Sequence, residues 1–174
     1  WAMRFDVTRP LSVAYCAGEG VSGLPTRFAA AAKFRGIDPT SLSNFFFFQT
    51  VPQLYYKQTR DTPTPADYIQ RFVTEWKERQ AGQLDLLVVD TLHAATVGAE
   101  ENSASDMGLV LQAVRYASNE LGCAVLLVHH TNKSGSAERG SSALRGAMDA
   151  MISVKKVSEE STSSKGAIQC EKLK

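Results

Sequence analysis

The sequence predicts a single α/β domain over residues 1–174, with a mostly parallel sheet flanked by helices and a C-terminal β-hairpin. Three observations predict this class. The runs Leu84–Asp90 and Cys123–Val128 are mostly apolar, which is typical of strands buried on both faces. Segments with helical spacing of apolar residues alternate with such runs, as in β–α–β units. Two strand-like runs joined by a polar turn close the chain, which indicates a hairpin.

The first half of the chain predicts two strands with a helix between them. Leu11–Ala17 is a strand that stops at a glycine-containing turn, and a helix follows over Leu24–Arg35, with Gly36 as its stop. Phe45–Phe48 is a short second strand. Because four uncharged aromatic residues would promote aggregation if they were exposed, we expect this strand to be covered.

The segment from Val51 to Pro63 has irregular spacing and reads as a loop. A solvated connector is its simpler interpretation, and a ligand-facing loop that uses its tyrosines and basic residues stays open. Thr64 and Pro65 then begin a helix, because a threonine can cap the first turn and proline suits the first helical position. Gly82 ends that helix.

The second half predicts two buried strands, a long helix and the hairpin. The helix covers about Ser103–Leu121 and follows a polar loop, His93–Asn102. Ala150–Val154 and Ala167–Leu173 are the hairpin strands, and Ser158–Gly166 is their polar turn.

Composition narrows the class of protein. The chain has 174 residues, of which 44% are hydrophobic, so it can bury one core. Its formal net charge of +1 predicts no strong global attraction to DNA or membranes, so nucleic-acid binding would need a local patch or an assembled ring. Cys16, Cys123 and Cys170 lie far apart in apolar or strand-like runs, which favours reduced core thiols in a cytoplasmic protein. No segment has transmembrane length or signal-peptide character.

Polar groups follow three of the expected strands, and together they favour phosphate chemistry. Asp90 ends a buried strand, where a carboxylate can hold hydrated Mg²⁺ with support from Thr91. Glu19 lies on the glycine-flanked turn Gly18–Gly23 and can accept a proton from a water that attacks a phosphoryl group. His130, or its neighbour at 129, can hydrogen-bond a terminal phosphate.

Each of these groups also has a plainer interpretation. Asp90 can cap the next turn, and the pair His129–His130 can be the polar end of a strand, with no third ligand of suitable spacing for a metal. Gly18–Gly23 also matches the spacing of a dinucleotide fingerprint. However, Glu19 would place negative charge where a pyrophosphate should lie, and no acidic residue ends the next strand.

A polar loop over Thr131–Ser142 follows the histidines and leads into a short helix. It contains Lys133 and Arg139, and Arg145 comes just after it. Such a loop can order around an anion or a nucleic-acid backbone, and the two arginines are candidates to reach a neighbouring subunit's phosphate. A disordered surface loop is the alternative.

Five ordered blocks of this sequence resemble the RecA-like ATPase domain of RepA-type plasmid and phage hexameric replicative helicases. The resemblance spans about Val13 to Val154. The blocks are Tyr15–Gly23 with Arg27, Leu87–Leu92, Glu100–Ser103 with Asp106–Gly108, Leu126–Lys133 and Arg139–Gly146.

This resemblance implies a RecA-like P-loop NTPase core that binds ATP and Mg²⁺, forms a hexameric ring and acts on single-stranded DNA. By position, Glu19 is similar to the catalytic carboxylate, Asp90 to the magnesium-site aspartate and His130 to the phosphate sensor. Lys133 falls in the DNA-facing loop. Arg139, or less directly Arg145, is similar to the arginine finger that completes the adjacent subunit's nucleotide site.

The sequence departs from the family pattern in one respect. It contains no Gly-x-x-x-x-Gly-Lys-Ser/Thr segment, which in this family precedes the position of Trp1. We therefore expect the phosphate-cradling strand and helix to be missing, with a gap in the sheet, weak ATP binding and marginal stability. Two other function classes stay open: a degenerate RecA-like module that assembles with an active partner, and a dinucleotide-binding oxidoreductase.

Overall fold

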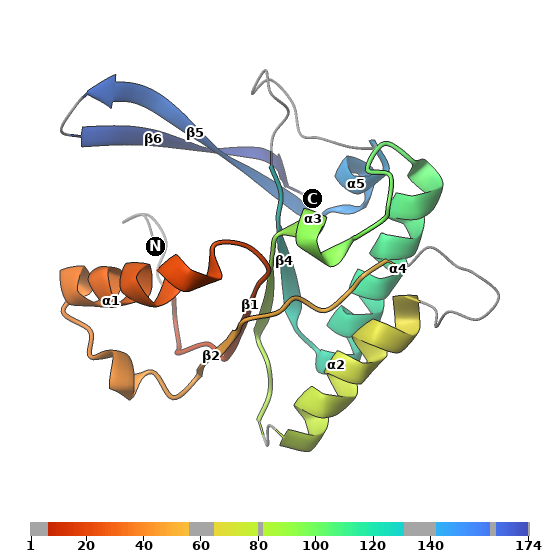
Figure 1. Ribbon diagram of the computed structural model, residues 1–174, viewed down its shortest axis with the longest axis horizontal. Helices are drawn as coiled ribbons and strands as arrows, with labels where there is room; N and C mark the ends of the chain where they lie inside the picture. Colours follow the sequence, from red (N-terminus) through yellow and green to blue (C-terminus); the bar gives the residue numbers. More distant parts are fainter. Residues whose placement is uncertain (1–6, 56–64, 80–81, 131–141, 161–162, 174) are drawn as a thin grey trace.

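A four-stranded parallel sheet forms the centre of the protein (Figure 1). The structure is a computed structural model that describes residues 7–55, 65–79, 82–130, 142–160 and 163–173. The strands lie in the order β2-β1-β3-β4. Their bounds are β1 (Val13–Ala17), β2 (Phe45–Phe48), β3 (Leu86–Asp90) and β4 (Ala124–Val128). The predicted α/β class with a mostly parallel sheet is confirmed.

The strand register places the carboxyl ends of β1, β3 and β4 at one level. Ala17 pairs with Asp90 across β1 and β3, and Asp90 pairs with Val128 across β3 and β4. All three strands run in the same direction, so the residues that follow them share one edge of the sheet. Ligands of parallel sheets bind at this edge, which we call the carboxyl rim.

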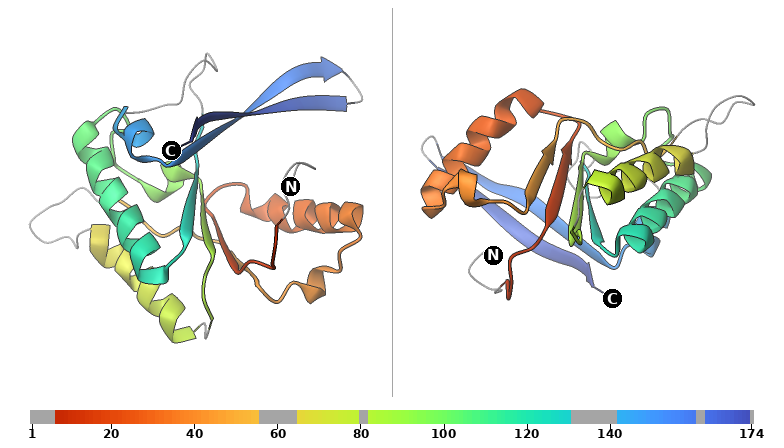
Figure 2. Two further views of the ribbon diagram at one scale, coloured as in Figure 1. Left: turned by 180° about the vertical axis from the view of Figure 1, so that it is seen from behind. Right: turned by 90° about the horizontal axis from the view of Figure 1, so that it is seen from below.

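Helices cover the two faces of the sheet unequally (Figures 1 and 2). α2 (Pro65–Arg79) and α4 (Ala104–Leu121) lie side by side on one face, and α1 (Leu24–Arg35) lies on the other. α4 begins at Ser103, whose hydroxyl accepts the amide N–H of Asp106, and it ends at Gly122, which has a φ of 62°. These two signals explain why this long helix begins and ends where the sequence predicts.

The hydrophobic core lies between the sheet and the α2–α4 layer. Its members come from alternate positions of the strands and from one stripe of each helix. The largest fully buried side chains are those of Leu54, Ile69, Leu84, Leu87, Leu92, Met107, Val73, Val89, Val110 and Cys16.

The phenylalanines of β2 are partly covered on both faces, as the sequence predicts. Phe46 meets Trp76 of α2 edge to face, with ring centroids 5.1 Å apart. On the opposite face, Phe45 stacks on Phe28 of α1 at 4.9 Å. The edge strand is therefore held by aromatic contacts from both helical layers.

β4 is the other edge strand of the four-stranded sheet, and it is much less covered. Leu126 remains 47% exposed on the face that carries α1, and Ala124 is exposed beside it. Within the described residues, no strand pairs with the outer side of β4. An exposed leucine on an unpaired edge is unusual, because soluble proteins normally protect such edges.

The closing hairpin is longer than the sequence predicts. β5 (Ala150–Glu160) and β6 (Ser163–Leu173) pair antiparallel, and their ladder continues through Ser158 opposite Lys165. The expected polar turn over Ser158–Gly166 is therefore mostly strand, and its predicted bounds were wrong. A two-stranded ribbon lies in solvent on both sides, so its backbone ladder continues through polar residues without an apolar pattern.

Short helices complete the chain. They are the 3₁₀ turns η1 (Val21–Gly23) and η2 (Pro39–Ser41), and the α-helices α3 (Leu92–Ala95) and α5 (Ser142–Ala147). α5 matches the short helix expected after the polar loop. α3 was not predicted, because four residues are too few to show a helical period.

Two further expectations were wrong in part. Leu54 and Tyr55, at the start of the segment expected to be a solvated connector, are only 1% and 6% exposed because they enter the core. Residues 56–63 of that segment lie outside the described residues. Cys16 and Cys123 are buried thiols, whereas Cys170 is exposed because it lies on the two-stranded hairpin.

An ion pair fastens the segment before β1 to the amino end of β3. The guanidinium of Arg9 donates to both oxygens of Asp85, at 2.9 and 2.6 Å, and the Ser12 amide adds a third bond at 2.9 Å. The Arg9 hydrogen bond, followed by the Ser12 amide, lowers the pKa of Asp85 to about 2, while burial opposes the shift.

This pair predicts a defined pH dependence of stability. A carboxyl whose folded pKa lies below its ordinary value of 3.8 stabilises the fold above that pH and loses the effect as pH falls toward 2. Asp85→Asn is therefore expected to lower the melting temperature at pH 6, and the difference from wild type should disappear near pH 2. A difference that is independent of pH would contradict this account.

Candidate functional site at the carboxyl rim

Glu19 lies on the turn that follows β1, and local geometry presents it at the rim. Gly20 adopts a φ of 60°, which only glycine adopts without strain, and it begins the turn into η1 and α1. Arg27 of α1 braces this turn by donating to the carbonyls of Gly20 at 3.1 Å and Gly23 at 3.4 Å. The Glu19 side chain is therefore carried by a braced turn, and it stays 46% exposed.

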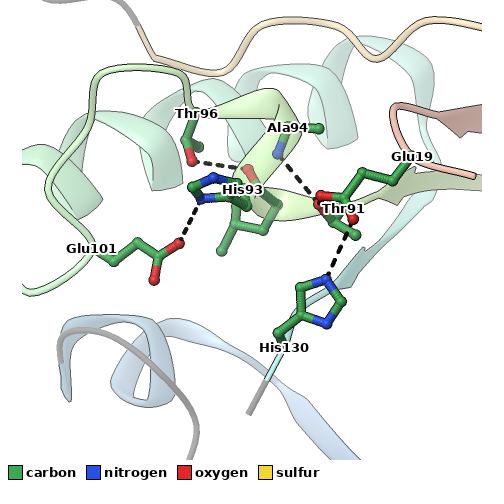
Figure 3. Close-up of polar contacts among 8 residues, drawn as sticks. Glu19, Thr91, His93, Ala94, Thr96, Glu101 and His130 are labelled. Carbon is green, nitrogen blue, oxygen red and sulfur yellow. Dashed lines mark hydrogen bonds and ion pairs between the residues drawn. The ribbon is translucent and has the colours of Figure 1, made fainter. Parts of the chain in front are cut away.

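Thr91 connects the ends of β1 and β3 (Figure 3). Its hydroxyl donates to Oε1 of Glu19 at 2.9 Å and accepts the Ala94 amide at 3.2 Å, which caps α3. The residue is only 3% exposed, and a cis peptide bond joins it to Asp90. One hydroxyl thus fixes both the start of α3 and the orientation of the Glu19 carboxylate.

His130, just beyond β4, approaches Glu19 from the other side. Its Nε2 lies 3.5 Å from Oε2 of Glu19. Figure 3 marks this contact with a dashed line. The Thr91 hydrogen bond lowers the pKa of Glu19, burial opposes the shift, and His130 lowers the pKa further. Glu19 therefore stays ionised at neutral pH, as a proton-accepting or water-orienting group must.

Asp90 lies beside this cluster at the end of β3, and its partner is a residue that the sequence did not single out for chemistry. The hydroxyl of Tyr15, on β1, donates to Oδ2 of Asp90. Burial, with the Asp90 hydrogen bond, raises the pKa of Tyr15 to about 12, so its proton remains in place at neutral pH. The signal that could have identified Tyr15 is its alternation with buried positions on the strand that precedes Glu19.

The segment after β2 supports α3 through two hydrogen bonds. Gln53 donates its side-chain amide to the Ala94 carbonyl at 3.0 Å, and the Leu54 amide donates to the Ala95 carbonyl at 2.7 Å. Val51 also packs against Gly18, at the start of the Glu19 turn. Sequence reasoning missed this support, because it joins segments about 40 residues apart.

The loop after α3 contains a second contact between a histidine and a glutamate. His93 Nδ1 lies 3.1 Å from Oε1 of Glu101, and the amide of Glu100 donates to Asp106 at 3.0 Å. The charge of His93 also contributes to the lowered pKa of Glu19. The polar loop that the sequence predicted is therefore ordered near the rim and close to the cluster.

The predicted site residues divide into three groups. The structure brings together Glu19, Thr91 and His130, and places Asp90 next to Thr91. Arg145 is exposed on α5. Lys133 and Arg139 lie outside the described residues, so their expected roles stay predictions.

A pocket of about 290 Å³ lies elsewhere, between α2 and the end of β2. It is mainly aromatic and aliphatic, with arginines on its border, and it contains none of the predicted site residues. Its lining is Phe48, Thr50, Val51, Pro52, Gln53, Tyr68, Arg71, Phe72, Glu75, Trp76 and Arg79. The chemistry-bearing groups are those of the rim, so we place the candidate site there.

The rim offers oxygen ligands of the kind that Mg²⁺ prefers. The described residues contain no group of three His, Cys, Asp or Glu side chains that could form a metal cage. Mg²⁺ instead commonly binds through one carboxylate, several waters and the phosphates of a nucleotide. Asp90 fits this mode: Tyr15 uses Oδ2, and among the described residues no donor occupies Oδ1.

A family model described as AAA domain matches residues 1–136, and the chain therefore belongs to that AAA domain family. This membership gives the class of the protein, an α/β nucleotide-binding ATPase domain. No curated protein is similar enough to the chain to count as a match. Membership gives the dinucleotide-binding alternative no support.

The family carries further general properties. AAA-type domains bind nucleotides, typically with Mg²⁺, and often assemble into rings. Within the part of the chain that the structure describes, each helix is too short or too polar to cross a membrane.

Proposed function

We propose that this chain is the core of an ATP-hydrolysing RecA-like motor, part of a ring-forming helicase that acts on single-stranded DNA in plasmid or phage replication. The observation that carries the proposal is the junction of Glu19, Thr91 and His130 at the ends of three adjacent parallel strands. Membership of the AAA domain family supports the ATPase part. The helicase part rests on the sequence resemblance.

Each rim residue has a role in this proposal. Glu19 accepts the proton of the attacking water, and Thr91 orients Glu19 and supports the metal side of the site. Asp90 would hold hydrated Mg²⁺ at the nucleotide, and the bound ion would neutralise phosphate charge. His130 touches the terminal phosphate and registers its loss.

The remaining predicted residues act on the adjacent subunit's nucleotide or on DNA, and not on the nucleotide at their own subunit's carboxyl rim. Arg139, with Arg145 as the second candidate, reaches the nucleotide of the adjacent subunit in a hexameric ring. A guanidinium is suited to this role because it binds phosphate oxygens with two parallel N–H groups. Lys133 contacts the DNA backbone from the loop that follows His130.

This proposal also requires a phosphate-cradling segment. We place it against β4, whose outer edge pairs with no strand among the described residues and whose Leu126 is 47% exposed. A strand and helix at that position would supply backbone N–H groups at the same rim.

Asp90→Asn in the full-length protein tests the metal role. It is expected to lower DNA-stimulated ATP turnover at least about tenfold, because an amide oxygen carries no net charge to hold metal-bound water. Asp85→Asn is the matched control, since it makes the same change at the opposite end of β3. Phosphate release at rising Mg²⁺ is the measurement, and equal turnover in both variants would contradict the proposal.

The second candidate function that we propose is a degenerate RecA-like module that assembles with an active partner and needs no nucleotide. Fluorescent ATP analogues distinguish the two. If the chain is a degenerate module, the analogue should not bind even when a phosphate-cradling strand and helix are added to the chain.

A further inference from the structure

Tyr15 is placed where it can control the orientation of Asp90. It lies in the middle of β1, and the register of the sheet puts it beside Val88, two residues before Asp90 on the neighbouring strand. From there its hydroxyl reaches forward and donates to Oδ2 of Asp90. The contact therefore follows from strand pairing alone and needs no flexible loop.

The ring of Tyr15 has little freedom to leave this position. It is half-buried beside two aromatic residues of the neighbouring strand β2, with ring centroids 6.4 Å from Phe45 and 6.3 Å from Phe47. Those rings limit rotation of the tyrosine, so the hydroxyl stays aimed at Asp90. A carboxylate at the open end of a strand would otherwise rotate about its side-chain bonds, and each orientation would present different oxygens to a ligand.

The hydrogen bond from Tyr15 also makes the two carboxylate oxygens of Asp90 different from each other. Oδ2 accepts the Tyr15 proton, whereas Oδ1 has no donor among the described residues and is available to a cation or to metal-bound water. Groups that hydrogen-bond a metal-binding carboxylate fix its geometry and strengthen its ligation.

We propose that Tyr15 is a positioning residue of the metal–nucleotide site, whose hydroxyl holds Asp90 in the orientation that binds the divalent cation. This inference rests on the proposed function, because it assumes that Asp90 serves a nucleotide-bound metal. In this inference the Tyr15 hydroxyl orients a metal ligand, which is more than the packing role of its ring beside β2.

Tyr15→Phe in the full-length protein tests this role, because phenylalanine keeps the ring and removes only the hydroxyl. Mn²⁺ is the probe, and free Mn²⁺ is measured by electron paramagnetic resonance in the presence of a saturating non-hydrolysable ATP analogue. The Kd for Mn²⁺ is expected to rise about 10–100-fold, the usual effect of removing a group that supports a metal ligand. Affinity for the analogue in EDTA should not change.

Tyr55→Phe is the matched control. Tyr55 is 6% exposed and also gives its hydroxyl to an aspartate, which is Asp106 and not Asp90. Loss of the Tyr55 hydroxyl is expected to lower the melting temperature and to leave the Kd for Mn²⁺ unchanged. If Tyr15→Phe behaves in the same way, Tyr15 is structural only and the inference is overturned.

Asp90→Asn separates this inference from the proposed function. Loss of Mn²⁺ affinity in Asp90→Asn, without loss in Tyr15→Phe, overturns the role of Tyr15 and leaves the metal site intact. Unchanged Mn²⁺ affinity in Asp90→Asn overturns the metal site itself.

Discussion

Replacing Glu19 with glutamine is expected to slow ATP turnover in the full-length protein by about 10²–10⁴-fold, the range usual for loss of a general base. Glutamine keeps the size of the side chain and can still accept the Thr91 hydrogen bond, which is 2.9 Å long in the wild type. It cannot take a proton from water. The effect should therefore fall on the rate of the chemical step, measured by single-turnover phosphate release, and not on nucleotide affinity.

Glu120→Gln is the control for this prediction. Glu120 is an exposed carboxylate of α4 that pairs with Lys77 at 2.7 Å, remote from the rim. Its replacement should leave turnover within about twofold of wild type, since surface ion pairs contribute little. Wild-type single-turnover rates in Glu19→Gln would remove Glu19 from the mechanism.

Gly18→Ala is expected to destabilise the fold by about 1–3 kcal/mol, because the added methyl group has no space. A Cβ at Gly18 would lie 2.5 Å from the Cβ of Ala94 and 3.2 Å from the nearest Val51 methyl. The nearer contact is a rigid Cβ of α3, not the end of a flexible chain, so the helix itself would have to move. Urea unfolding followed by circular dichroism measures the loss.

Gly108→Ala is the control, and it is expected to stabilise the fold where Gly18→Ala destabilises it. Gly108 lies inside α4, and no atom falls within 4 Å of a Cβ built there. Alanine at that site should raise the free energy of unfolding by about 0.5–1 kcal/mol, because glycine weakens helix interiors. If Gly18→Ala and Gly108→Ala changed the free energy of unfolding equally, crowding would not be the reason for a glycine at position 18.

The sequence predicted most of the sheet and the positions of the rim carboxylates, because those signals are local. The apolar run that ends at Asp90 predicts a strand, and the glycines around Glu19 predict a turn. Each prediction needs only neighbouring residues in the sequence. Once the strands are parallel, their ends must meet at one edge. The junction of Glu19 with His130 follows from that rule.

The rest depends on pairing between distant segments, which one sequence does not reveal. Tyr15 meets Asp90 only because β1 lies beside β3 in a particular register. Gln53 supports α3 only because the segment after β2 returns to the rim. The length of the hairpin was missed for a different reason, since a ladder of backbone bonds leaves no trace in hydrophobic spacing.

The support of α3 by Gln53 and Leu54 has a mechanical consequence. Two hydrogen bonds tie that helix to the chain leaving the outermost strand, and Thr91 ties the same helix to Glu19. A displacement of the chain that leaves β2 would therefore shift α3 and, through Thr91, the carboxylate of Glu19.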